Sequence, residues 1–422
     1  MFRSVSVGHG MENNTVSNSP DSPTSDPENT LDSLLAALHE RGLLNKPQVE
    51  AAFRAVPRHL FLPGLTPNDV YIDDAIPIKY DDEGHVVSSS SQPSMMLLML
   101  EQLDLKPGLN VLEIGTGTGY NAAIIQYLVG QKGKVTSVEF DPIIARQAND
   151  NLLRARYSSV LVVTDDGAAG YAPRAAYDRI ICTAGIWDVP SVWIRQLKTD
   201  GLIVTPIALD GAQVSATFQR IGHETLESSD NIPCGFVLMQ GAGASPAQYR
   251  KVGSTALTLA GERISQMDTT ALHLLLSSDQ DQCHLGQSLA PGDIWRGFST
   301  YMMLNHPPEY TFAMYSIAKD QQAYGMEGSG VALFSPGSAC LIPYNGQGLT
   351  YCFAGSDSFI MTEKLMSEWL ELGRPDVNQL RLRLSPKSEG LPQIQRGRLY
   401  ERRDHYLHVW LETPPVTDSP TS

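Results

Sequence analysis

The sequence predicts a doubly wound α/β fold followed by a smaller α+β region. Short apolar runs alternate with helical stretches between residues 111 and 208, and a glycine-rich turn follows the first of these runs. After about residue 240 the pattern changes to β-type alternation. Strands that alternate with helices form a parallel sheet with helices on both faces.

The composition is that of an ordinary folded protein. The 422 residues are 42% hydrophobic and 18% charged, which suffices for two or three domains. The net charge of −15 disfavours a nucleic-acid partner, because an acidic surface repels phosphate. No apolar run approaches the ~20 residues of a membrane span, and no signal peptide is recognisable. We therefore expect a soluble, cytoplasmic protein.

Metal and disulfide sites are not expected. The five cysteines are odd in number, widely spaced and without a C-x-x-C pair. His405 and His408 are three residues apart, so in a strand they would point to opposite faces. Cys283 and His284 have no second pair at zinc spacing.

The first part of the chain is predicted to be helical. Residues 1–29 are rich in Ser, Asn, Pro, Asp and Thr, and we expect a disordered tail there. Apolar residues recur at helical spacing from 31 to about 60. Residues 93–104 are apolar nearly all round, which predicts a buried helix that begins at Pro93.

The alternating region follows. Strands are predicted at 111–115, 134–140, 160–166, 177–184 and 201–208, and helices at 120–130, 142–155 and 189–197. Because crossovers are right-handed, few topologies fit, and the arrangement is Rossmann-like.

Residues 241–248 indicate a junction to a second region. Beyond it, strands are predicted at 331–335, 339–344, 349–355, 379–385 and 398–412, with a helix at 357–372. We expect a C-terminal α+β domain at 246–412, suited to substrate recognition, and a disordered tail at 413–422.

The strongest functional signal is VLEIGTGTGY at 111–120. Glu113 lies within the strand, and the turn that follows contains Gly115, Gly117 and Gly119. This turn lies at the carboxyl end of a strand, where open α/β sheets bind nucleotides. Glu139 ends the next strand, where a carboxylate can accept both ribose hydroxyls. The E-x-G-x-G-x-G pattern favours S-adenosylmethionine (SAM) over NAD; a dinucleotide-binding turn and a turn without a ligand are the alternatives.

The third strand ends at Thr164-Asp165-Asp166-Gly167. Asp166 could accept a hydrogen bond from an adenine amino group. An ordinary Asp-Gly loop explains the same residues.

Several segments together resemble the protein-L-isoaspartyl O-methyltransferase family over roughly residues 31–240. In order they are VPRHLF (56–61), Tyr71-Ile72-Asp73 with 75–78, Ser91-Gln92-Pro93, 111–120, 135–139, Asp166-Gly167, 177–184 and 196–207. The resemblance implies a SAM-dependent methyltransferase domain at 30–240 that acts on a polypeptide.

The resemblance also implies site residues. The cofactor-binding set is Glu113, Gly115, Thr116, Gly117, Gly119, Glu139, Asp166 and Gly167. Ser91 would hydrogen-bond the accepting carboxylate, and Asp73 would orient its loop. A flexible serine-rich loop and a simple cap are the alternative readings of these two residues. A carboxylate is already ionised at neutral pH, so methyl transfer to it requires alignment and no general base.

The chain departs from the family around the peptide-binding side. Ser88, Ser89 and Ser90 stand where the family has Gln-Thr-Ile, and the loop 79–85 is longer and more acidic. With the extra domain, this favours tailoring of a ribosomally made precursor peptide, with succinimide formation. General repair of isoaspartyl proteins is the alternative, and a non-catalytic SAM-binding interaction protein is a third possibility.

Overall fold

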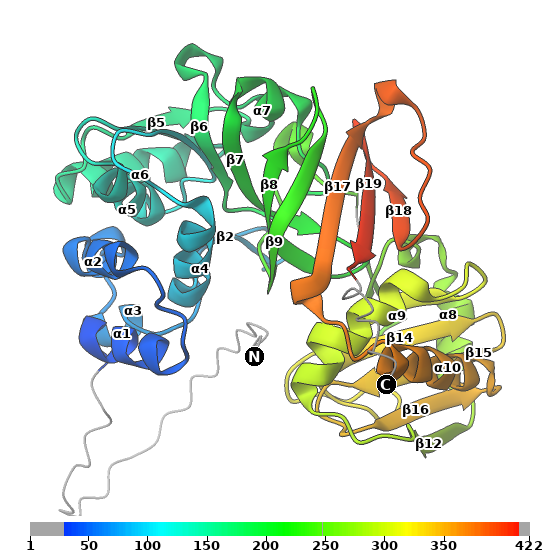
Figure 1. Cartoon of the computed structure of the whole chain (residues 1–422). Helices are drawn as coiled ribbons and strands as arrows, with labels where there is room; N and C mark the ends of the chain where they lie inside the picture. The colour runs from blue at the N-terminus through cyan, green and yellow to red at the C-terminus, as the bar shows by residue number, and fades with distance from the viewer. Residues whose placement is uncertain (1–28, 247, 413–422) are drawn as a thin grey trace, which may run out of the picture.

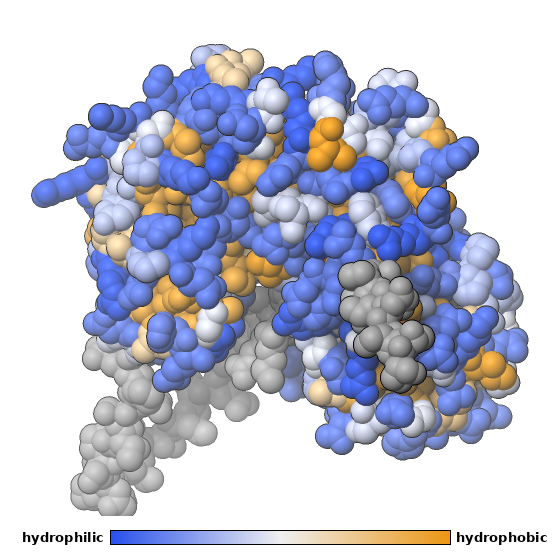
Figure 2. Space-filling view, viewed as in Figure 1, coloured by the Kyte–Doolittle hydropathy of each residue, from blue (hydrophilic) through white to orange (hydrophobic). Residues whose placement is uncertain are grey.

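The computed structural model describes residues 29–246 and 248–412, so the predicted tails lie outside the described residues, apart from Asn29. The described chain contains a ten-stranded sheet, a seven-stranded sheet and a two-stranded hairpin (Figure 1). Hydrophilic residues dominate the face drawn in Figure 2, and hydrophobic ones emerge mainly between the helices of the N-terminal half. The predicted α/β class with a sheet-rich C-terminal region is confirmed.

The ten-stranded sheet has a parallel half and an antiparallel half. The parallel strands, in spatial order, are β7 (Leu197–Ala208), β6 (Tyr177–Cys182), β3 (Asn110–Ile114), β4 (Lys134–Glu139) and β5 (Leu161–Thr164). The antiparallel strands continue from β7 as β8 (Gln213–Arg220), β9 (Leu226–Cys234), β17 (Leu380–Pro386), β19 (His405–Leu411) and β18 (Arg398–Glu401).

Strand β3 lies at the point where the strand order reverses. From β3 the chain adds β4 and β5 on one side, and then β6 and β7 on the other. The ends of strands on the two sides of such a point diverge and leave a crevice for a ligand. The glycine turn after β3 therefore lies at the switch point.

Helices cover one face of the parallel half. They are α1 (Leu31–Glu40), α2 (Pro47–Ala55), α4 (Pro93–Leu103), α5 (Tyr120–Val129) and α6 (Pro142–Arg154). Their apolar stripes share one core with the inward side chains of β3, β4, β6 and β7. The predicted stripe of Leu34, Leu35 and Leu38 is buried in this core, which confirms the helical periodicity.

The opposite face is covered by α7 (Ser191–Gln196) and by the C-terminal region. The second sheet is built from β10 (Tyr249–Lys251), β11 (Leu257–Ala260), β13 (Thr311–Ile317), β14 (Ser329–Ser335), β15 (Ser338–Pro343), β16 (Leu349–Ala354) and β12 (Gln280–His284). Its helices are α8 (Thr269–Leu276), α9 (Ser299–Asn305) and α10 (Asp357–Glu371).

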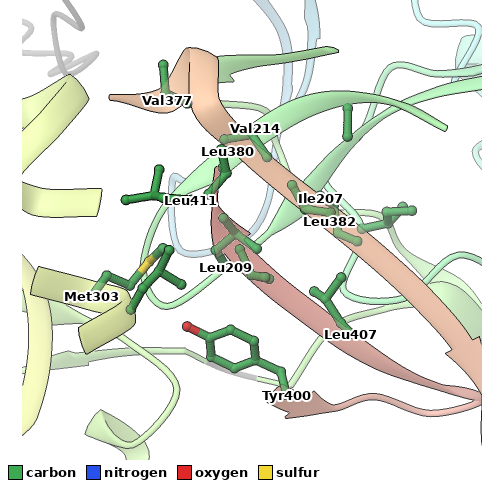
Figure 3. Packing of buried hydrophobic residues seen from close by; sticks show 14 of the residues in the cluster. Ile207, Leu209, Val214, Met303, Val377, Leu380, Leu382, Tyr400, Leu407 and Leu411 are labelled. Atoms are coloured by element: carbon green, nitrogen blue, oxygen red, sulfur yellow. The ribbon is translucent and has the colours of Figure 1, made fainter. Parts of the chain in front are cut away.

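One hydrophobic core joins the two sheets. It contains Trp193 of α7, Met303 of α9 and Leu333 of β14 together with side chains of the ten-stranded sheet. Figure 3 shows part of it, where Met303 lies beside Leu209, Leu411 and Tyr400. The C-terminal region is thus packed continuously on the α/β region.

The last strands differ from the prediction. The segment 398–412, predicted as one strand, is a hairpin of β18 and β19 with its turn at 402–404. The strand is interrupted by three consecutive polar residues, Arg402, Arg403 and Asp404. Each of them donates a hydrogen bond to a different residue outside the hairpin. Moreover, β17 pairs with β9, so the ten-stranded sheet crosses the predicted boundary near residue 246. The division into a domain at 30–240 and a domain at 246–412 stays a prediction.

Candidate active site

The glycine turn between β3 and α5 requires glycine for two separate reasons. Gly115 has φ +93°, and a Cβ built on it would lie 2.7 Å from Thr183 Oγ1. Gly117 has φ +53°, and its Cβ would lie 3.4 Å from the carbonyl oxygen of Ser89. Other residues rarely adopt positive φ, and at Gly115 a side chain would also clash with Thr183. The turn therefore presents bare backbone.

A cavity with about 950 Å³ of empty space, part of it open to solvent, lies against this turn. Six of the predicted site residues line it: Ser91, Gly115, Thr116, Gly117, Glu139 and Gly167. The other four predicted residues, Asp73, Glu113, Gly119 and Asp166, are not among the lining residues. Gly119 packs against α6, where an added Cβ would lie 3.2 Å from the carbonyl oxygen of Ala148.

Glu139 provides the carboxylate in the cavity wall. The residue is 8% exposed, and burial raises the pKa of its carboxyl above the usual value. Its Oε2 accepts a hydrogen bond from the amide of Gly117 at 2.9 Å, and its Oε1 accepts one from Asp141 at 3.2 Å. Each carboxylate oxygen can accept a further hydrogen bond, so Glu139 retains capacity for hydroxyl donors.

Glu113 supports the glycine turn from below. It is fully buried, and burial raises the pKa of its carboxyl to about 7. Its two oxygens accept hydrogen bonds from Asn121 Nδ2 at 2.8 Å and from Ser137 Oγ at 2.5 Å. Ser137 Oγ lies 2.6 Å from Thr116 Oγ1, so the network reaches a residue that lines the cavity.

Asp166 caps a short helix beside the cavity. Its Oδ1 accepts from the amide of Ala168 at 2.9 Å, and its Oδ2 accepts from the amide of Ala242 at 2.7 Å. Gly167, which begins this turn, packs so closely that a Cβ would lie 2.4 Å from Ile114 Cγ2. The predicted contact of Asp166 with adenine stays a prediction.

Asp73 contacts the residues that follow Ser91, and its role in orienting the serine loop stays a prediction. Its Oδ1 accepts from the amide of Ser94 at 2.8 Å, at the first turn of α4, and its Oδ2 pairs with Arg41 at 2.5 Å. Its carbonyl oxygen accepts from Gln92 Nε2 at 2.9 Å. Asp73 therefore holds Gln92 and Ser94, the residues on either side of Pro93. Pro93 itself lies two residues beyond Ser91.

Arg58 is a buried cation that the sequence analysis did not single out. It is 1% exposed, and burial lowers the pKa of its guanidinium. Nη1 donates to the carbonyls of Val70 at 2.8 Å and Ile72 at 3.2 Å, and Nη2 donates to Ser91 at 3.0 Å. It thus joins the segment around Asp73 to the segment around Ser91. Arg58 lies within VPRHLF, one of the segments that carry the family resemblance, so the sequence did contain a sign of its importance.

A hairpin of β1 (Ile76–Tyr80) and β2 (Val86–Ser90) borders the cavity. Ser88, Ser89 and Ser90 of β2 line it. Lys79 of β1 forms an ion pair with Asp141, which also caps the N-terminus of α6. This ion pair lowers the pKa of the Asp141 carboxyl and attaches the hairpin to the loop that follows Glu139.

The remaining wall was not predicted. Thr183 donates its hydroxyl to the carbonyls of Gly115 at 2.8 Å and Ile114 at 3.2 Å. Residues 237–240 line the cavity after β9, and backbone hydrogen bonds attach them to Gly185. Their sequence has no turn or charge signature, so nothing local marked them.

No group of three or more His, Cys, Asp or Glu side chains within 29–246 and 248–412 is placed to hold a metal ion. Among the helices of the described residues, none is long and apolar enough to cross a membrane.

Comparison with known proteins identifies relatives of this region. A family model described as protein-L-isoaspartate(D-aspartate) O-methyltransferase matches residues 29–243. A protein-L-isoaspartate O-methyltransferase of Archaeoglobus fulgidus is 43% identical over 160 residues, which are 38% of this chain and 70% of that protein. The enzyme of Methanococcus vannielii is 38% identical over 181 residues, which are 43% of this chain and 84% of its own length. A solved structure from Plasmodium falciparum, in complex with S-adenosyl-L-homocysteine, covers 50% of this chain and 99% of that chain, with 20% identity and a TM-score of 0.44.

Proposed function

Because this chain belongs to the protein-L-isoaspartate(D-aspartate) O-methyltransferase family, we propose that it methylates the free carboxylate of L-isoaspartyl residues in damaged proteins. The family assignment makes the chain a SAM-dependent transferase. The observation that supports the proposal is that one cavity is lined both by the glycine turn with Glu139 and by Ser88–Ser91. Cofactor and acceptor can therefore share one enclosed space.

The cofactor side fits SAM. Gly115 and Gly117 line the cavity with backbone alone, and Glu139 offers acceptor oxygens at the neighbouring strand end. Thr116 and Gly167 line the same space, while Glu113 holds the turn from behind. When bound, SAM supplies an electrophilic methyl group.

The acceptor side provides hydroxyl and backbone groups. We propose that Ser91 donates a hydrogen bond to the accepting carboxylate, with Asp73 and Arg58 as positioning residues for its loop. A carboxylate with a pKa near ~4 is ionised at neutral pH, so these residues need only orient it and exclude water. The hairpin, attached through Lys79 to Asp141, covers the glycine turn at Ser89 and supports that exclusion.

The expected consequence of esterification is succinimide formation. The backbone nitrogen of the following residue attacks the ester carbonyl, methanol leaves, and the nitrogen loses its proton. Hydrolysis of the ring then returns part of the residue to a normal aspartyl linkage. This chemistry needs no further group from the chain.

Tailoring of one dedicated precursor peptide is the second candidate, and the extra C-terminal region was its main support. Three strands of that region belong to the ten-stranded sheet, and its helices α9 and α10 share the core on one face of that sheet. These contacts give the region a structural role that requires no dedicated peptide, which favours repair. A cytoplasmic location stays a prediction.

The test is methyl transfer from labelled SAM to a short isoaspartyl peptide beside its aspartyl twin, with Gly117→Asp as the inactive control. Several unrelated isoaspartyl sequences are assayed in parallel. Repair predicts turnover on all of them and none on the aspartyl twin. Turnover restricted to one sequence context would favour tailoring, and SAM binding without transfer to any peptide would favour a non-catalytic interaction protein.

A further inference from the structure

The tip of the β18–β19 hairpin, residues 402–405, contacts three other loops, which follow β6, β9 and β11. Arg402 is 1% exposed, donates to the carbonyl of Ala208 at 3.2 Å and pairs with Glu262 at 2.7 Å. Its guanidinium also lies over the rings of Trp187 and Tyr400, at 5.1 and 5.0 Å from the ring centres. The turn is therefore anchored inside the molecule.

A buried pair connects this turn to the loop after β6. His405 Nδ1 lies 2.9 Å from Asp188 Oδ1, with side chains that are 0% and 8% exposed. The other oxygen of Asp188 accepts a hydrogen bond from the amide of Asp404 at 2.7 Å. Both carboxylate oxygens of Asp188 are thus engaged by adjacent residues of the turn.

Arg403 connects the turn to the loop after β9. Its guanidinium donates to the carbonyl of Ala242 and, at 3.1 Å, to the carbonyl of Ala244. The amide of Ala242 donates to Asp166 at 2.7 Å. Ala242 is therefore held from one side by the predicted adenine-binding carboxylate and from the other by the C-terminal hairpin.

These two loops continue into the cavity wall. Residues 237–240, immediately before the segment held by Arg403, line the cavity, as does Ala184. Gly185 donates its amide to Val237 at 2.8 Å and accepts from the amide of Met239 at 2.9 Å. A shift of either loop would therefore move this part of the cavity wall.

We infer that the turn 402–405 positions this cavity wall, so that the C-terminal region is part of the cofactor-binding unit. Arg403 acts through Ala242 and Ala244, and His405 acts through Asp188. Residues 402–405 lie outside the segment 29–243 that matches the family model. The inference rests on the proposed function only for the identity of the ligand.

The test compares the full-length chain with Arg403→Ala and Arg403→Lys. The control is Arg383→Ala, an arginine of β17 that pairs with Glu227 and stacks on Trp410. Calorimetry with S-adenosyl-L-homocysteine measures affinity without a methyl acceptor, and amide hydrogen exchange measures the mobility of 237–244. Initial rates give KM for SAM and kcat separately.

Loss of the two hydrogen bonds of an exposed arginine is expected to weaken binding about three- to tenfold in Arg403→Ala. Arg403→Lys should recover part of the lost affinity, because its ammonium still donates hydrogen bonds but lacks the forked geometry of the guanidinium. We expect a higher KM for SAM with a smaller change in kcat, faster exchange at 237–244, and unchanged behaviour of Arg383→Ala.

Unchanged affinity and unchanged exchange in Arg403→Ala would overturn the inference, as would equal effects in Arg383→Ala. If the wild-type chain bound no S-adenosyl-L-homocysteine, the proposed function would fail. The exchange measurement would still decide whether the turn holds the wall. Asp188→Asn tests the second connection and is expected to accelerate exchange at the amides of Gly185 and Met239.

Discussion

Replacement of Gly115 by alanine should weaken SAM binding by an amount that the structure divides into two parts. The first part is backbone strain, because φ is +93°, and such a conformation costs a non-glycine residue roughly 1–2 kcal/mol. The second part is a steric clash, because the new Cβ would lie 2.7 Å from Thr183 Oγ1. Thr183 would have to move and lose its hydrogen bond to the Gly115 carbonyl, at about 1 kcal/mol.

Together these two costs amount to roughly 2–3 kcal/mol. If the turn avoids them by leaving its binding conformation, the affinity for SAM should fall about 30- to 150-fold. Thr183→Ala removes the clashing oxygen. In the double variant only the backbone part should remain, so Gly115→Ala should harm binding less in the Thr183→Ala background than in the wild type. This non-additivity is measured in a double-mutant cycle by calorimetry.

Gly130→Ala is the matched control. Gly130 also has a positive φ, +67°, but nothing lies within 4 Å of its added Cβ, and it does not line the cavity. We expect it to lower stability by ~1 kcal/mol without a change in SAM affinity. Wild-type affinity in Gly115→Ala, or strictly additive effects with Thr183→Ala, would refute the role given to this turn.

Three further predictions concern buried charges. Arg58→Lys should lower the free energy of unfolding by about 3 kcal/mol in urea titrations, because one ammonium cannot reach carbonyls on both segments, and methyl transfer should fall with it. Glu113 should contribute its full stabilisation below about pH 4.5 and lose it as the pH rises through the raised pKa of about 7. Glu113→Gln should therefore make the free energy of unfolding less dependent on pH between about pH 5 and about pH 8. Glu139→Gln should weaken SAM binding about tenfold in calorimetry, because one acceptor oxygen becomes an amide donor; equal affinity would remove Glu139 from the cofactor site.

Much of the site was accessible to sequence reasoning. Glycines with a strand before them and an apolar helix after them form a local pattern, and Gly115, Gly117 and Glu139 do line one cavity. Ser91 and Asp73 came from the family resemblance. Asp73 holds Gln92 and Ser94, and the roles of Ser91 and Asp73 toward the acceptor stay predictions.

Other parts depend on contacts between distant segments. The segment VPRHLF contains Arg58 but does not tell what the side chain contacts; folding brings the carbonyls of residues 70–74 and 90–91 around its guanidinium. The same holds for Asp188 and His405, which are 217 positions apart and touch in the interior. No window of the sequence contains both partners.

The sequence by itself determined the parallel half of the sheet, the helices between its strands and the glycine turn, because hydrophobic periodicity and turn chemistry act over a few residues. Only the tertiary structure decided that β17, β18 and β19 extend the same sheet and that their hairpin tip braces the cavity wall. Strand pairing across some 150 residues depends on which sheet edge remains free after the rest has folded. The free edge was β9, and the pairing of β17 with β9 joins the C-terminal region to the sheet that carries the site.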